Sequence, residues 1–205
     1  MNAKRKQSGF TIIELVVVIL LLGILTATAL PRFMDVTDEA HTAVVDALVG
    51  GMVTGNALFR AQWVAEGQPL TSTVSEFSMF ASTGGYPKGT DQGTTGDPLV
   101  ATACLNIYDN LLQTGRPTAA SFTPATATAA AVESDIETAA SSNTTADVLA
   151  SLVQGSPINS STTCNYYYVG QHRSGTSTNT ASIPMITYNF STGVVSRSTI
   201  TLNTD

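Results

Sequence analysis

A single carboxylate, Glu14, lies inside the apolar run from Phe10 to Leu30. A carboxylate in hydrocarbon costs several kcal/mol unless something pairs with it, so this position predicts a partner. The run has 21 residues, and as an α-helix it rises about 31 Å, which matches the hydrocarbon core of a bilayer. The cations Lys4, Arg5 and Lys6 precede it, and the positive-inside rule places them in the cytoplasm. We therefore expect a membrane-spanning helix with one charge that needs a partner.

Cys104 and Cys164 are the two cysteines of the chain. In an oxidising compartment they would form one disulfide across 59 intervening residues, which stabilises the fold by about 4 kcal/mol in the chain-entropy model. The alternative is two unrelated buried thiols. Export of the chain after the apolar run favours the disulfide.

The chain offers little for catalysis. Its histidines, His41 and His172, lack a nucleophile or ligand set, and we find no sequence motif of a hydrolase, zinc protease, EF-hand or phosphate-binding loop. Asp91 and Asp97 lie in a Gly-rich loop and have the oxygen ligands that Ca²⁺ prefers, although ordinary loop acids are the simpler interpretation. We expect no catalytic residue, no metal and no cofactor.

The composition excludes nucleic acid as a partner. Nine Lys and Arg against fifteen Asp and Glu give a formal charge of −6, whereas phosphate binding needs clustered cations. Only 12% of the residues are charged, which is typical of an exported protein with a polar, weakly charged surface. The length suits one globular head with a terminal extension.

The elements that must position these residues begin with a long helix. Residues 31–66 indicate an amphipathic continuation of the apolar helix, to about Trp63. The capping pattern predicts a short helix over 102–115 that carries Cys104 and another over 145–155. Residues 117–163 hold 28 Ala, Ser and Thr in 47 positions, and outside the second short helix we assign no structure there.

The C-terminal part is typical of strands. The stretches "CNYYYVG", "IPMITYNF" and "VVSRSTITL" are rich in aromatic and β-branched residues, with a hairpin turn at residues 191–193. Because strand side chains alternate between faces, at least one of Tyr166, Tyr167 and Tyr168 should be buried. The pattern predicts an α+β head in which a small antiparallel sheet packs on the amphipathic helix.

Two ordinary interpretations of the N-terminal segment fit poorly. A secretory signal cleaved after Ala29 would release a soluble binding domain, but Glu14 lies inside its apolar region and the helical pattern continues past the cleavage point. A plain membrane anchor fits the length but leaves Glu14 unexplained.

The stretch "SGFTIIEL" with its basic leader and uninterrupted apolar span resembles the type IV pilin family. In that family a membrane-embedded peptidase cuts after the glycine, here Gly9, and methylates the new N-terminal residue, here Phe10. Cleavage would create an ammonium on Phe10, so that Glu14 of one subunit can pair with the Phe10 amine of a neighbour in a filament and fix the register. The resemblance also implies that the helix softens at Gly23 and Pro31 during polymerisation.

The resemblance implies the type IV pilin fold, in which a long N-terminal helix, half membrane-spanning and half amphipathic, packs on a small antiparallel sheet with one disulfide. Removing the leader leaves six cations and fifteen anions, a formal charge of −9. The expected division is a leader (1–9), a membrane-spanning and filament-core helix (10–30), an amphipathic continuation (31–66) and a head (67–205) with a variable region (117–163).

Further stretches, among them "ATALPRFMDVTDEAHTAVVDALVGG" and "ACLNIYDNLLQ", are similar to pilins of the mannose-sensitive haemagglutinin (MSHA) system, most of all to its B-type minor pilin. This implies a Gram-negative surface filament for attachment and biofilm formation. The implied partners are other pilin subunits, the prepilin peptidase and the inner-membrane assembly platform. Before assembly the head would be periplasmic. The nearest alternative is a pseudopilin of type II secretion, and the resemblance does not separate major, minor and priming subunits.

Overall fold

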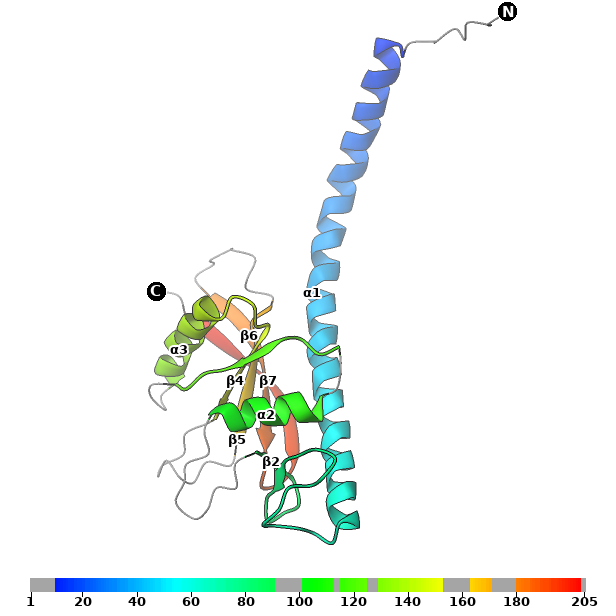
Figure 1. The fold of residues 1–205 in the computed structure, drawn as a ribbon. Coiled ribbons are helices and arrows are strands. Elements are labelled where there is room, and N and C mark those ends of the chain that lie inside the picture. Colours follow the sequence, from blue (N-terminus) through cyan, green and yellow to red (C-terminus); the bar gives the residue numbers. More distant parts are fainter. Residues whose placement is uncertain are drawn as a thin grey trace, which may run out of the picture. The chain divides into compact units, whose positions relative to one another are not determined.

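The computed structural model describes residues 10–90, 101–112, 115–124, 129–152, 163–170 and 180–203, and within them the side chains other than those of 31–38, 101, 129–133, 180–181 and 202–203. The helices are α1 (Ile12–Ala65), α2 (Ala101–Leu111) and α3 (Ala129–Ser142). The strands are β1 (Phe80–Ala81), β2 (Pro87–Gly89), β3 (Ala119–Ser121), β4 (Val148–Leu152), β5 (Thr163–Tyr168), β6 (Thr180–Asn189) and β7 (Val194–Asn203) (Figure 1). The expected α+β class is confirmed.

The chain divides into two compact units, Met1–Thr42 and Ala43–Asp205. Helix α1 contributes to both, and its bounds agree within two residues with the expected helix from Phe10 to about Trp63. The second unit contains all described strands, α2, α3 and the C-terminal part of α1.

The main sheet has the order β3-β4-β5-β6-β7. Its neighbours pair antiparallel except β3 and β4, which are parallel. The three expected C-terminal strands are confirmed as β5, β6 and β7, and the expected turn joins the last two. The helix expected over 145–155 is wrong, because Val148–Leu152 is strand β4. All five of its residues are buried, and a short apolar run buried on both faces carries no period that separates strand from helix.

One face of the sheet packs against α1 and α2. Side chains of α1 at helical spacing enter this core together with alternate residues of β4, β5 and β6. The α1 residues are Val45, Leu48, Met52, Phe59 and Trp63. The amphipathic part of α1 therefore packs on the sheet as expected.

The C-terminal end of α2 lies directly against α1. A Cβ atom added to Gly55 would lie 2.7 Å from the carbonyl oxygen of Leu111, and one added to Gly51 would lie 2.6 Å from Cδ2 of Leu112. The two glycines thus allow a close approach that larger residues would block. Just after α2, Arg116 donates a hydrogen bond of 3.0 Å to the carbonyl of Leu112.

The other face of the sheet is covered by α3. Ile136 and Ala139 of this helix form a second core with residues of β4, β5 and β6, among them Tyr167. The Ala, Ser and Thr-rich region, to which we assigned only one helix, thus contains β3, α3 and β4. Because both faces are covered, all three consecutive tyrosines of β5 are buried.

Three buried tyrosines of the core donate hydrogen bonds to backbone carbonyls in other parts of the chain. Burial raises the pKa of each above its ordinary value of 10.0. A buried hydroxyl needs a partner, and each of these donates to a carbonyl oxygen outside its own strand or helix. The pairs are Tyr108 with Pro117 at 3.0 Å, Tyr166 with Cys104 at 2.9 Å, and Tyr188 with Pro87 at 3.0 Å.

Candidate functional site

The N-terminal half of α1 forms an apolar surface. Between Phe10 and Leu30 every side chain except the partly exposed Ala29 is exposed, and the only polar ones are Thr11, Glu14, Thr26 and Thr28. An exposed apolar surface of this extent predicts contact with a membrane or with a protein partner. Two stretches of α1, Ile12–Leu30 and Glu39–Ala65, are long and apolar enough to cross a membrane, and a third of the second is buried.

Thr11 and Glu14 form a reciprocal hydrogen-bonded pair at the start of α1. Oε2 of Glu14 accepts hydrogen bonds from the Thr11 N–H at 2.9 Å and from the Thr11 hydroxyl at 2.7 Å. The Glu14 N–H in turn donates to Thr11 Oγ1 at 3.4 Å. This is a capping box, in which Thr11 caps the helix and Glu14 occupies its third position.

The capping box engages one carboxylate oxygen of Glu14. Among the described residues, the other oxygen, Oε1, accepts no hydrogen bond. Hydrogen bonds to Thr11 stabilise the carboxylate but leave its charge uncompensated. The site can therefore accept one more strong donor, and a cation would also cancel the charge.

The remaining polar side chains of the apolar surface are satisfied within the helix. The Thr26 hydroxyl donates to the carbonyl of Leu22 at 2.9 Å, and the Thr28 hydroxyl donates to the carbonyl of Leu25 at 3.0 Å. Such back-bonding removes the cost of placing a hydroxyl in hydrocarbon. Glu14 is thus the one charged side chain on this surface.

The other residues predicted for this site lie along the same helix or before it. Phe10 precedes the first turn, whereas Gly9 and the leader lie outside the described residues. Gly23 has open space where a Cβ would project. Pro31 lies within the bounds of α1, but its side chain is not among those described. The softening expected at Gly23 and Pro31 stays a prediction.

Thr11 is the site residue that our sequence analysis missed. The signal was present, since "TIIE" has the threonine and glutamate spacing of a capping box. A lone carboxylate in an apolar run indicates a cation as its partner, whereas the first partners of Glu14 are donors of the same chain.

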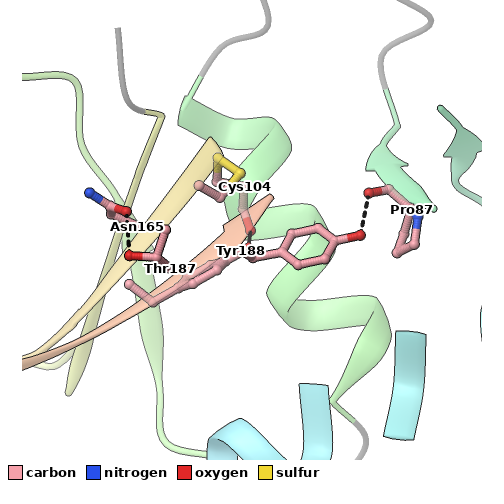
Figure 2. The surroundings of a disulfide bond; sticks show 7 residues. Pro87, Cys104, Asn165, Thr187 and Tyr188 are labelled. Carbon is pink, nitrogen blue, oxygen red and sulfur yellow. Dashed lines mark hydrogen bonds between the residues drawn. A yellow bond between two sulfur atoms is a disulfide. The ribbon is translucent and has the colours of Figure 1, made fainter. Parts of the chain in front are cut away.

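Cys104 of α2 and Cys164 of β5 form the expected disulfide, with Cα atoms 5.5 Å apart. The alternative of two separate thiols is wrong. Figure 2 shows the disulfide beside Tyr188, whose hydroxyl points to the Pro87 carbonyl. The bond ties α2 to the centre of the sheet.

The calcium hypothesis for Asp91 and Asp97 lies outside the described residues, as does His172. Within the part of the chain that the structure describes, no three His, Cys, Asp or Glu side chains come together as a metal site would require. His41 lies on α1, partly exposed.

Comparison with known proteins gives one family model and several relatives that match this chain. Residues 4–30 match the family described as prokaryotic N-terminal methylation motif. The chain is 40% identical over 91 residues to the type IV narrow pilus major component of Thermus thermophilus, covering 44% of this chain and 77% of that protein.

Two further relatives match over shorter parts of their length. Fimbrial protein Q of Moraxella bovis is 38% identical over 87 residues, covering 42% of this chain and 53% of that protein. The type II secretion system core protein G of Pseudomonas aeruginosa is 49% identical over 41 residues, covering 20% of this chain and 29% of that protein. No solved structure matches the chain significantly.

Proposed function

As this chain belongs to the type IV pilin family, we propose that it is made as a precursor, cut between Gly9 and Phe10, methylated on Phe10, and assembled through α1 into a surface filament. The observation that carries the proposal is the Thr11–Glu14 capping box, which holds a carboxylate with one unused oxygen on an exposed apolar helix. The subunit itself has a structural role.

The chemistry of assembly follows from the charge of Glu14. Cleavage after Gly9 creates an ammonium on Phe10, and the free oxygen of Glu14 in a neighbouring subunit can accept it. Two buried charges then become a neutral pair, which contributes little net stability but penalises any register that leaves both unpaired. The assembled contact is therefore selective for one axial position of the subunit.

The test of processing is the intact mass and N-terminal sequence of the protein from sheared surface material and from membranes. We expect a chain that starts at methylated Phe10 in the sheared material. A chain that starts at Leu30 would instead mean cleavage by signal peptidase after Ala29 and a soluble exported domain.

The test of the charge pair uses two variants of Glu14. Glu14→Ala should leave the protein in the membrane but exclude it from filaments. Glu14→Gln keeps an oxygen that can accept the Thr11 hydrogen bonds but has no charge, so it should also fail to assemble. Normal incorporation of Glu14→Gln would mean that capping, and not charge pairing, is the role of this residue.

We further propose that the subunit is a minor component of an MSHA-type pilus that serves attachment and biofilm formation. The similarity of several stretches along the chain to MSHA pilins supports this. Its partners would be other pilins, the prepilin peptidase and the inner-membrane assembly platform, with the head periplasmic before assembly. The number of copies relative to other pilins in sheared filaments tests the minor role, since a major subunit would dominate that fraction.

A second candidate is a pseudopilin of type II secretion. The local identity to the secretion core protein G favours it, although that match covers a fifth of this chain. A pseudopilin would stay in the cell envelope, and its deletion would block protein secretion. Recovery from sheared surface filaments with normal secretion in the deletion strain would exclude this candidate.

A further inference from the structure

The start of α1 lies very close to the proposed cleavage point. The helix begins at Ile12, and Phe10 and Thr11 lie before it, outside any helix or strand. Both side chains are exposed, that of Phe10 by 88%. The match to the N-terminal methylation motif, residues 4–30, covers the same stretch. Whatever fixes the start of α1 therefore also fixes the backbone that follows the cut bond.

Thr11 fixes this start through three polar groups. Its N–H and its hydroxyl donate to the Glu14 carboxylate at 2.9 and 2.7 Å. Its carbonyl accepts a hydrogen bond of 3.3 Å from the Leu15 N–H. A residue in the cap position has extended backbone angles, whereas the next residue is helical. The capping box therefore keeps the chain extended at Thr11 and directs it into the helix at Ile12.

Cleavage needs this extended geometry. Peptidases cut bonds in open segments of the chain, and in a helix the backbone groups are occupied by hydrogen bonds of the helix itself. In the proposed cleavage, water adds to the Gly9 carbonyl carbon and the bond to the Phe10 nitrogen breaks, which gives a carboxylate on Gly9 and an ammonium on Phe10. A helix that began instead at Ser8, which also has a capping hydroxyl, would include both of these residues.

We propose that Thr11 is a positioning residue for this cleavage. The inference rests on the proposed function and assigns Thr11 an action through the capping box, not on the reacting atoms. The box presents Phe10 to the peptidase directly before a fixed helix start, so binding does not have to order or unwind this end of the chain. Glu14 then acts twice: it supports the cap before cleavage, and it accepts the ammonium of a neighbouring subunit afterwards.

Loss of the cap should raise KM for cleavage and leave kcat unchanged. A substrate whose competent form is only partly populated binds more weakly in proportion to that fraction, whereas the bound form reacts as before. Thr11→Val has nearly the same shape as threonine but cannot form the capping box. For full-length precursor in detergent, cut by purified prepilin peptidase, we expect KM to rise about fivefold, which corresponds to the loss of about 1 kcal/mol of capping.

Two cap-forming variants separate positioning from direct recognition. Thr11→Ser keeps the hydroxyl. Thr11→Asn replaces it with an amide that can accept from the Glu14 N–H and donate to the Glu14 carboxylate. Both variants should be cut with KM near the wild-type value. Rescue by serine alone would mean that the peptidase binds the hydroxyl itself, which would overturn the positioning role.

Two further variants serve as controls. Thr26→Val removes an exposed hydroxyl from the same apolar surface, where it bonds to the carbonyl of Leu22 at 2.9 Å, and should leave KM unchanged. Glu14→Gln keeps an oxygen for the capping box, so it should be cut normally although we expect it to fail in assembly. A rise in KM for either control as large as that for Thr11→Val would overturn the proposal.

Failure of this inference and failure of the proposed function give different results. If wild type and Thr11→Val are both cut after Gly9 with the same KM, the positioning role is wrong and the processing site stands. If the wild-type precursor is not cut after Gly9, the proposed function and the inference fail together. A higher KM for Thr11→Val that both serine and asparagine reverse would support the inference.

Discussion

Replacing Gly55 with alanine should loosen the contact between α1 and α2. The new Cβ would lie 2.7 Å from the carbonyl oxygen of Leu111 and 3.2 Å from its Cβ, and neither group is the end of a flexible side chain. Overpacking of this kind costs about 1 to 3 kcal/mol, and a fixed carbonyl places the cost at the upper end. Better helix propensity returns about 1 kcal/mol. We expect the free energy of unfolding to fall by about 2 kcal/mol.

Gly50 is the matched control for this change. It lies on the same helix, and nothing lies within 4 Å of an added Cβ, so Gly50→Ala should raise the free energy of unfolding by about 1 kcal/mol. Urea unfolding of the full chain in detergent can be followed by the fluorescence of Trp63, which is the only tryptophan and is buried in this core. Equal stability of the two variants would refute the close approach of α2 to Gly55.

Three further predictions concern other parts of the chain. Thr11→Val should reduce incorporation into sheared filaments whereas Thr11→Ser should not, and equal incorporation would remove the capping box from the assembly argument. Burial raises the pKa of Tyr108, Tyr166 and Tyr188 in the folded state. The stability that these neutral side chains contribute is therefore complete below their unfolded pKa near 10. Above that pH the free energy of unfolding falls by about 1.4 kcal/mol per pH unit for each group. Tyr166→Phe should reduce this slope in alkaline unfolding curves, and an unchanged slope would contradict the assignment. Replacing Cys104 and Cys164 together with serine should lower the free energy of unfolding by about 4 kcal/mol in urea titrations, and a loss under 1 kcal/mol would mean that packing alone holds α2.

The parts of the fold that were predictable have long periodic patterns or specific turn residues. Helix α1 has a continuous helical pattern, and the β6–β7 hairpin has alternating β-branched residues around a Gly193 turn with positive φ. Strand β4 was mistaken for a helix because its five buried residues have no amphipathic period. Helix α3 was missed because alanine, serine and threonine give a weak apolar stripe, and Ile136 is its one large residue in the core.

The residues of the candidate site also differ in how far the sequence alone predicts them. Glu14 was identifiable because one charge in an apolar run is costly wherever the chain folds. Its partner Thr11 is marked by the capping-box spacing of "TIIE", a signal of local helix geometry that an argument from charge alone does not use. The roles of Gly23 and Pro31 concern a change during assembly, and neither a sequence pattern nor a single folded chain determines them.

The hydrogen bonds of Tyr108, Tyr166 and Tyr188 affect which parts of the head can change in sequence during evolution. Each hydroxyl binds a main-chain carbonyl, a group that every residue type supplies, and not a particular side chain. The carbonyl of Cys104 lies in α2 and that of Pro87 in β2, whereas that of Pro117 lies in the connection between α2 and β3. The side chains of the connection that contains Pro117 can therefore change by single substitutions while the hydrogen bond from Tyr108 and the core behind it stay in place.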